Sequence, residues 1–67
     1  MFAERFRSIV DENKISRYKI AKELNVSQST VANWYFGDNE PKATQIAALC
    51  KYFDVSADYL LGITDEY

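Results

Sequence analysis

The sequence contains no histidine, a single cysteine, one proline and two glycines. Without histidine, the chain lacks the most common general base and the most common metal ligand of proteins. One cysteine cannot form a disulfide within the chain, and two glycines are too few for a glycine-rich phosphate-binding loop. Since no nucleophile–base pair or metal-ligand cluster is recognisable either, we expect no enzyme activity, no bound metal, no cofactor and no small-molecule ligand.

Long apolar runs are also missing. The longest covers only residues 46–50, whereas a membrane-spanning helix needs about 20 apolar residues. The first seven residues, MFAERFR, place charges where a secretion signal is apolar. We therefore expect a soluble protein of the reducing cytoplasm that makes no membrane contact.

The 67 residues, 48% hydrophobic and 27% charged, are sufficient for one small domain. The net charge of −2 is unevenly distributed. Residues 1–51 hold all eight Lys and Arg and six of the ten Asp and Glu, a net charge of +2, and residues 52–67 hold the other four acidic residues, −4. Because the acidity belongs largely to the tail, the overall charge does not exclude a nucleic-acid partner.

Apolar residues recur at helical spacing almost throughout, and no stretch alternates long enough to form a strand. The pattern predicts an all-α, compact domain of five helices: one near the N-terminus, then 17–24, 28–36, 42–53 and a short one after residue 56 that Gly62 ends. Serines 16, 27 and 56 are expected N-caps, and Asn25 is expected to take the left-handed conformation after the second helix. Lys42 is a poor N-cap, so we expect the fourth helix to begin loosely or earlier, with Pro41 in its first turn.

The same spacing predicts which side chains are buried. The expected core residues are Phe2, Phe6, Ile9, Val10, Ile20, Ala21, Leu24, Val31, Trp34, Ile46, Ala47, Leu49, Cys50, Phe53 and Leu61, together with Tyr59 or Leu60. Trp34 is assigned to the core rather than to a stacking surface because it lies three residues after Val31 on the same helical face.

The segment that carries the functional prediction is 17–36. Its two helices are joined by only three residues, 25–27, and a connection this short makes the helices cross steeply. Ala21 supplies the small side chain that a close crossing requires. Val31 and Trp34 hold the inner face of the second of these helices, so its outer face is left free.

The outer face of helix 28–36 carries short, uncharged side chains, namely Gln28, Ser29, Ala32 and Asn33. Gln and Asn can pair with adenine through two hydrogen bonds, Ser can donate or accept, and an Ala methyl group suits the thymine methyl group. We therefore predict that these four side chains contact DNA bases rather than forming only a solvated surface. Nearby basic residues are expected to contact phosphates: Arg17, Lys19, Lys22 and Lys42.

Two runs resemble the phage repressor/Cro-type (lambda-repressor-like, XRE) helix-turn-helix domain. They are IAKELNVSQSTVANW at 20–34, followed by Gly37 and Pro41, and FDVSADYLLG at 53–62. The resemblance implies a sequence-specific regulator of transcription, often a repressor, whose third helix lies in the major groove of double-stranded DNA. It also implies a homodimer joined through the fifth helix and the nearby loop.

Within that family, the positions that contact bases correspond to Gln28, Ser29 and Asn33, with Ala32 alongside. The phosphate contact at the start of the second helix corresponds to Arg17, where Gln is more usual. The resemblance assigns residues 1–62 to the DNA-binding domain and leaves residues 63–67 as a frayed C-terminal end or a linker stub.

The sequence departs from the family pattern in two places. The loop 38–40 is acidic where the family is usually basic, and Tyr35 and Phe36 occupy positions that are commonly polar. The aromatic pair can stack on a sugar, pack against the first helix or join a partner. These departures and the low pI of 4.9 favour a second hypothesis, a protein-interaction module on the same fold that acts as an antirepressor or antagonist of another regulator.

Overall fold

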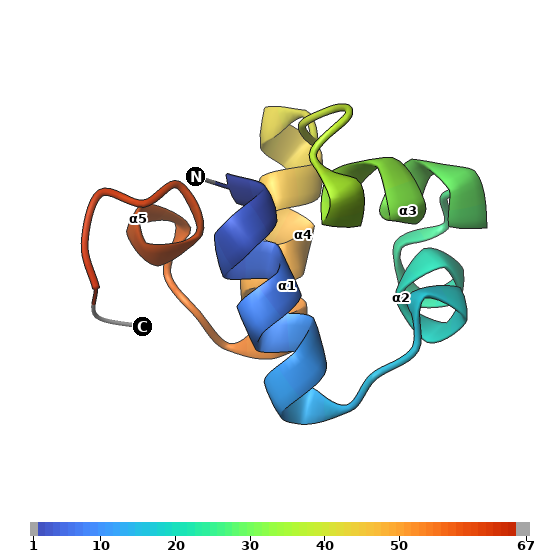
Figure 1. The fold of residues 1–67 in the computed structure, drawn as a ribbon, viewed down its shortest axis with the longest axis horizontal. Coiled ribbons are helices and arrows are strands. Elements are labelled where there is room, and N and C mark those ends of the chain that lie inside the picture. The colour runs from blue at the N-terminus through green and yellow to red at the C-terminus, as the bar shows by residue number, and fades with distance from the viewer. Residues whose placement is uncertain (1, 66–67) are drawn as a thin grey trace.

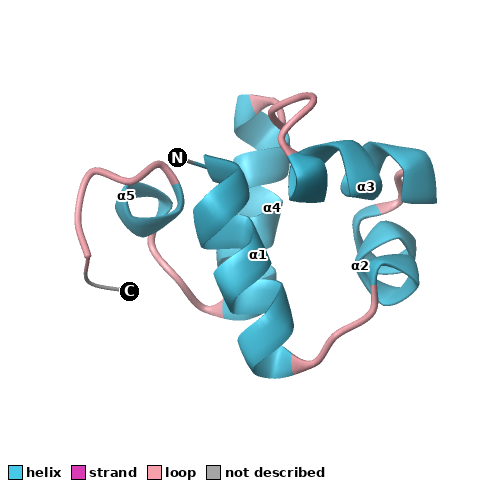
Figure 2. Ribbon diagram, in the orientation of Figure 1, coloured by secondary structure: helices cyan, strands magenta, loops and turns pink. Residues whose placement is uncertain are grey.

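The computed structural model describes residues 2–65. The five helices in this part of the chain are α1 (Phe2–Asn13), α2 (Arg17–Leu24), α3 (Gln28–Phe36), α4 (Ala43–Phe53) and α5 (Ala57–Leu60). Between residues 2 and 65 there is no strand (Figure 2). In Figure 1, α1 stands at the centre, with α2 and α3 on one side of it and α5 on the other. α1 packs against α3 and α5, and α2 packs against α3 and α4, so the all-α, five-helix prediction is confirmed.

Local side-chain caps fix the helix starts. Ser16, Ser27 and Ser56 each accept a hydrogen bond from the backbone N–H three residues later, over distances of 3.1, 3.0 and 3.1 Å. Asn25 ends α2 in the left-handed conformation, with a φ of 58°. These caps confirm the sequence prediction, and they explain why α2 begins and ends, and α3 begins, where the sequence places them.

The start of α4 differs from the prediction. The helix begins at Ala43, and Pro41 lies before it rather than in its first turn. Lys42 occupies the N-cap position, where its backbone N–H donates a hydrogen bond of 2.7 Å to Oε1 of Gln45. This bond from the third residue of the helix to the N-cap N–H is one half of a capping box, and it ties Lys42 to the first turn of α4 although the Lys42 side chain forms no capping hydrogen bond.

All five helices contribute side chains to the core. Trp34 is 2% exposed and packs edge-to-face on Phe6, with 6.1 Å between ring centroids, and Phe6 in turn stacks on Phe2 at 5.4 Å. The buried core residues are Phe2, Phe6, Ile9, Val10, Ile20, Ala21, Val31, Trp34, Leu49, Tyr59 and Leu60. The predicted apolar stripe of α1 and the predicted inner face of α3 are therefore confirmed.

Burial is less complete on α4 and α5 than predicted. Ala47 is exposed, and Leu61 keeps 47% of its surface in solvent. Three further expected core residues of α4, Ile46, Cys50 and Phe53, are only half-buried, as is Leu24 at the end of α2. α5 ends at Leu60 after a single turn, and within residues 2–65 no helix covers the side of α4 that carries Ala47. Partial burial raises the pKa of the Cys50 thiol, as expected for a small hydrophobe rather than a reactive cysteine.

The described part of the C-terminal segment lies against α1 and α5. The backbone N–H of Ile63 donates to the carbonyl of Asp58 at 2.8 Å. The Arg5 guanidinium lies 4.5 Å from the ring centroid of Tyr59 and forms an ion pair of 2.7 Å with Asp65. The hydrogen bond to Asp65 raises the pKa of Arg5. The division into 1–62 and a frayed end or linker at 63–67 stays a prediction, and residues 66–67 lie outside the described residues.

Candidate nucleic-acid interface

α2 and α3 form a pair whose relative position is set by a short turn. The backbone N–H of Val26, in the connection 25–27, donates to the carbonyl of Ala21 at 3.0 Å. Ala21 is 3% exposed, and Val31 on α3 is fully buried. A helix held on one side by Val31 and Trp34 cannot rotate about its axis without exposing them, so the opposite face of α3 is presented in a fixed orientation.

The predicted base-contacting side chains share this opposite face. Gln28 and Ser29 are exposed, and Ala32 and Asn33 are half-buried. Positions 28, 29, 32 and 33 are neighbours along one side of a helix. No residue of α3 is charged, so hydrogen bonding and shape, rather than net charge, determine what this face can recognise.

Gly37 ends α3 because its φ of +84° lies in the left-handed region, which residues with a side chain rarely adopt. The acidic loop that follows is exposed. The backbone N–H of Asp38 donates to the carbonyl of Asn33 at 2.9 Å, so the loop turns back over the end of α3.

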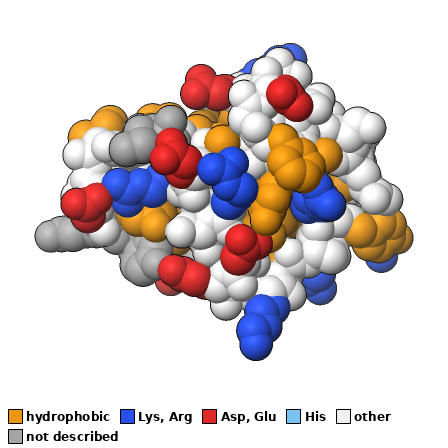
Figure 3. Space-filling view, in the orientation of Figure 1, with side chains coloured by type: hydrophobic (Ala, Val, Ile, Leu, Met, Phe, Trp, Pro, Cys, Tyr) orange, Lys and Arg blue, Asp and Glu red, His pale blue; other side chains and the backbone are white. Residues whose placement is uncertain are grey.

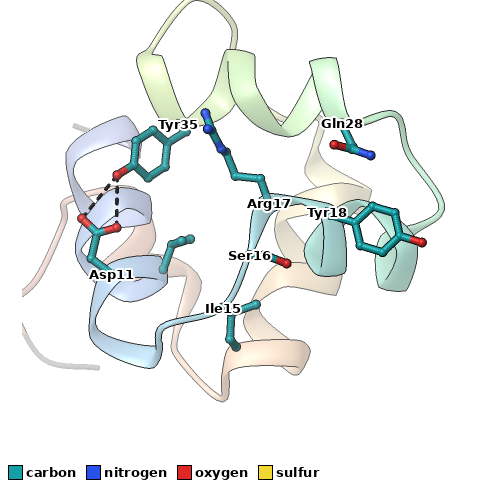
Figure 4. A pocket seen from close by; sticks show the side chains of 8 residues that line it. Asp11, Ile15, Ser16, Arg17, Tyr18, Gln28 and Tyr35 are labelled. Atoms are coloured by element: carbon teal, nitrogen blue, oxygen red, sulfur yellow. Dashed lines mark hydrogen bonds between the residues drawn. The ribbon is translucent and has the colours of Figure 1, made fainter.

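A groove of about 430 Å³ runs beside the start of α2 and the start of α3 (Figure 4). The residues that line it are Val10, Asp11, Ile15, Ser16, Arg17, Tyr18, Gln28 and Tyr35. The groove therefore brings together Arg17, a predicted phosphate contact, and Gln28, a predicted base contact. In Figure 4, Arg17 extends toward Tyr35, while Tyr18 lies on the side of Gln28.

Tyr18 is a candidate contact residue that sequence reasoning missed. It is 59% exposed and lines the groove with Arg17 and Gln28. A signal was present in the sequence, because a large aromatic side chain in the first turn of a helix whose apolar face lies elsewhere has no packing role. An exposed tyrosine can donate its hydroxyl proton to a phosphate oxygen, which is a common contact in protein–DNA complexes.

Tyr35 and Phe36 differ in their surroundings, which bears on whether each packs against the first helix or stays available to a sugar or a partner. Tyr35 packs against α1: its hydroxyl donates to the two carboxylate oxygens of Asp11 at 3.1 and 3.3 Å, and Nη1 of Arg7 donates to its carbonyl at 2.8 Å. The hydrogen bond to Asp11 raises the pKa of Tyr35. Phe36, in contrast, is 62% exposed. Arg17 lies over both rings, with its guanidinium carbon 5.3 Å from each centroid.

The other predicted phosphate contacts are more dispersed. Lys19 and Lys22 are exposed on α2, Lys42 is exposed just before α4, and none of the three lines the groove. On the face shown in Figure 3, basic side chains are interspersed with acidic ones, and an apolar cluster lies beside one of the basic groups. This face thus carries single positive charges at separate points rather than one continuous basic patch.

The comparisons with known proteins agree with this geometry. The model of the Helix-turn-helix family matches residues 6–60. The uncharacterized HTH-type transcriptional regulator YobD of Bacillus subtilis (strain 168) is 26% identical over 66 residues, which cover 98% of this chain and 59% of that protein.

Two solved structures resemble the whole domain. A transcriptional regulator from Listeria innocua superimposes with a TM-score of 0.90 at 33% identity, over 100% of this chain and 63% of its own. The P22 c2 repressor, solved in complex with synthetic operator 9T in the presence of Tl+, gives a TM-score of 0.82 at 30% identity, over 90% of this chain and 91% of its own. The chain thus spans less than two thirds of the Bacillus and Listeria regulators.

Among residues 2–65, no helix combines the length and the apolar character that crossing a bilayer requires.

Proposed function

Because the chain belongs to the helix-turn-helix family of the phage repressor/Cro type, we propose that it binds double-stranded DNA at specific sequences and regulates transcription as a repressor. The observation that carries the proposal is the outer face of α3, which is uncharged, rich in hydrogen-bonding groups and held in place by buried Val31 and Trp34. The P22 c2 repressor supports it, since that protein was solved on a synthetic operator.

In the proposed complex, α3 lies in the major groove. Gln28 and Asn33 pair with adenine edges, Ser29 bonds to a neighbouring base, and the methyl group of Ala32 meets a thymine methyl group. Phosphates on either side are held by basic side chains: Arg17, Lys19, Lys22 and Lys42. Base contacts of this kind set the preferred sequence, whereas the phosphate contacts set register and contribute affinity at every sequence.

We expect the protein to act by binding alone, without catalysis or a cofactor, in the cytoplasm. The relatives named above are transcriptional regulators or repressors, which supports this assignment. They do not favour the second hypothesis of a protein-interaction module. A salt titration distinguishes the two, because DNA binding weakens steeply with salt and an aromatic-centred protein contact changes little.

The experiment that tests the function is selection from a random DNA duplex pool by the purified protein, at low and at physiological salt. Enrichment of a motif supports the proposal. A two-fold symmetric motif with half-sites about 34 Å apart, one turn of DNA, indicates a dimer on the site, and a single half-site indicates a monomer. If no motif is enriched even at low salt, the DNA-binding proposal is wrong.

Replacing Arg17 with alanine tests the phosphate contact. We expect weaker binding at all duplex sequences alike, and a log–log salt slope that is shallower by about 0.9, because one phosphate contact and its released counterion are lost. Fluorescence anisotropy at several salt concentrations measures both effects. Lys51→Ala is the matched control, since it removes the same charge from the last turn of α4. A loss confined to one sequence, or an unchanged slope, would contradict the assignment.

We further propose that two copies associate through α4 and α5. An apolar groove of about 450 Å³ lies there, lined by Pro41, Ala43, Ile46, Ala47, Ala57 and Leu61. Exposed Leu61 and Ala47 are the side chains that a second copy would cover. The Leu61→Glu variant is expected to sediment as a monomer at concentrations where the wild type is a dimer, because a buried, unpaired charge is costly.

Phe36→Ser is the control for the association experiment, since it removes an exposed apolar side chain that lies outside this groove. We expect it to sediment like the wild type. If Leu61→Glu also sediments like the wild type, whether both are monomers or both are dimers, the proposed interface is wrong.

A further inference from the structure

The Arg17 side chain is held in an unusual way. Among residues 2–65 no hydrogen bond or ion pair involves its guanidinium group, yet the guanidinium carbon lies 5.3 Å from the ring centroids of both Tyr35 and Phe36. The two rings meet edge-to-face, with 5.1 Å between their centroids. A guanidinium held by cation–π contacts spends no N–H group on a hydrogen-bond acceptor, so its N–H groups stay available to other acceptors. The structure therefore presents an arginine that is oriented but whose donors are unused.

We propose that Tyr35 and Phe36 are positioning residues that hold the Arg17 guanidinium in the orientation in which it binds a DNA phosphate. This inference rests on the proposed function of the α2–α3 pair. An exposed arginine samples many rotamers, and ordering such a side chain on binding lowers affinity. Contact with two rings restricts those rotamers in the free protein. The entropy cost of ordering Arg17 on DNA binding is therefore smaller.

Tyr35 gives this arrangement its rigidity. Its ring is half-buried, its hydroxyl donates to both oxygens of Asp11, and its carbonyl accepts from Arg7, so two residues of α1 fix it (Figure 4). The hydrogen bond to a carboxylate also increases the electron density of the ring, which strengthens its attraction for a cation. Asp11 thus affects the contact between Arg17 and Tyr35 indirectly, through its hydrogen bond to the Tyr35 hydroxyl.

Phe36 connects the arrangement to the DNA-reading face. It lies three and four residues after Asn33 and Ala32, which places it one turn further along the same side of α3. Arg17 projects from α2, but it rests on the end of α3. The phosphate contact is therefore fixed relative to the helix that reads the bases, and Arg17 sets the register of Gln28 and Asn33 on the DNA backbone.

A double-mutant cycle on DNA binding tests the inference. Arg17→Lys keeps the charge but loses the planar guanidinium that lies over the rings, and Phe36→Leu keeps an apolar side chain but loses the aromatic face. We expect each single variant to bind the selected duplex at least about threefold more weakly than the wild type. The double variant is expected to bind no more weakly than either single one, and Phe36→Tyr, which keeps the ring, is expected to bind like the wild type.

Three results would overturn the inference. Additive losses in the double variant would mean that Phe36 contacts DNA directly. Unchanged binding by Phe36→Leu would mean that the contact has no role, and tighter binding would mean that the rings hold Arg17 away from the phosphate. Because Phe36 is exposed, thermal unfolding of all variants is expected to match the wild type and serves as the control for folding.

The same experiment separates this inference from the proposed function. A wild-type protein that selects no sequence overturns both. Suppose instead that the wild-type protein selects a motif and that Arg17→Ala makes the salt slope shallower. Additive losses of affinity in the double-mutant cycle would then overturn only the positioning role.

Discussion

Replacing Trp34 with alanine is expected to remove most of the stability of the domain. Trp34 is 2% exposed and packs on Phe6, and removing a large buried aromatic side chain costs about 3–5 kcal/mol of unfolding free energy. A domain of this length has a total stability of about 3–10 kcal/mol. Urea unfolding followed by circular dichroism measures the loss, because the substitution also removes the only tryptophan that fluorescence could report.

Two controls belong with this experiment. Trp34→Phe keeps an aromatic ring in the core and is expected to lose less stability than Trp34→Ala. Phe36→Ala truncates an aromatic side chain that is 62% exposed, so its effect is expected to stay within about 0.5 kcal/mol. If Trp34→Ala destabilises the protein no more than Phe36→Ala does, Trp34 does not hold α3 to the core, and the fixed presentation of its outer face has another cause.

Several features of the fold could be predicted because their causes are local. A serine hydroxyl that caps a helix and an asparagine that ends one act within a few residues, so both ends of α2 and the start of α3 follow from Ser16, Asn25 and Ser27. The start of α4 was predicted wrongly because the side chain of Gln45 acts on the residue before the helix. The burial of Leu61 was predicted wrongly because exposure depends on which neighbours cover a residue, and helical spacing shows only which face is apolar.

The candidate site likewise has some features that can be predicted from the sequence and some that cannot. The chemical character of the outer face of α3 can be predicted, since residue type and helical spacing determine it. The contact of Arg17 with Tyr35 and Phe36 cannot, because it joins the start of α2 to the end of α3, and Tyr35 in turn contacts Asp11 of α1. The base and phosphate roles themselves remain predictions that binding experiments must test.

Gln28→Ala is expected to have the largest effect on sequence recognition. Gln28 is the first residue of α3, is exposed and lines the groove beside Arg17, so its amide is available to a base edge. Losing a two-point contact with a base costs about 1–3 kcal/mol, or roughly 5- to 150-fold in affinity at the preferred site. Repeating the selection with the variant is expected to show relaxed preference at one base pair. Affinity for unrelated duplexes and the salt slope are expected to stay unchanged, because the removed group carries no charge.

The chain provides a matched control in its second glutamine, Gln45. That residue lies in the first turn of α4, where its side chain accepts the hydrogen bond from the backbone of Lys42. Gln45→Ala is therefore expected to lower stability by about 0.5–1 kcal/mol through the lost cap, with no change in the selected motif. A changed motif in Gln28→Ala, with a lower stability but an unchanged motif in Gln45→Ala, would distinguish a residue that reads bases from one that stabilises the fold. If Gln28→Ala selects the wild-type motif with undiminished affinity, α3 does not read DNA through this residue, and the orientation assigned to its outer face is wrong.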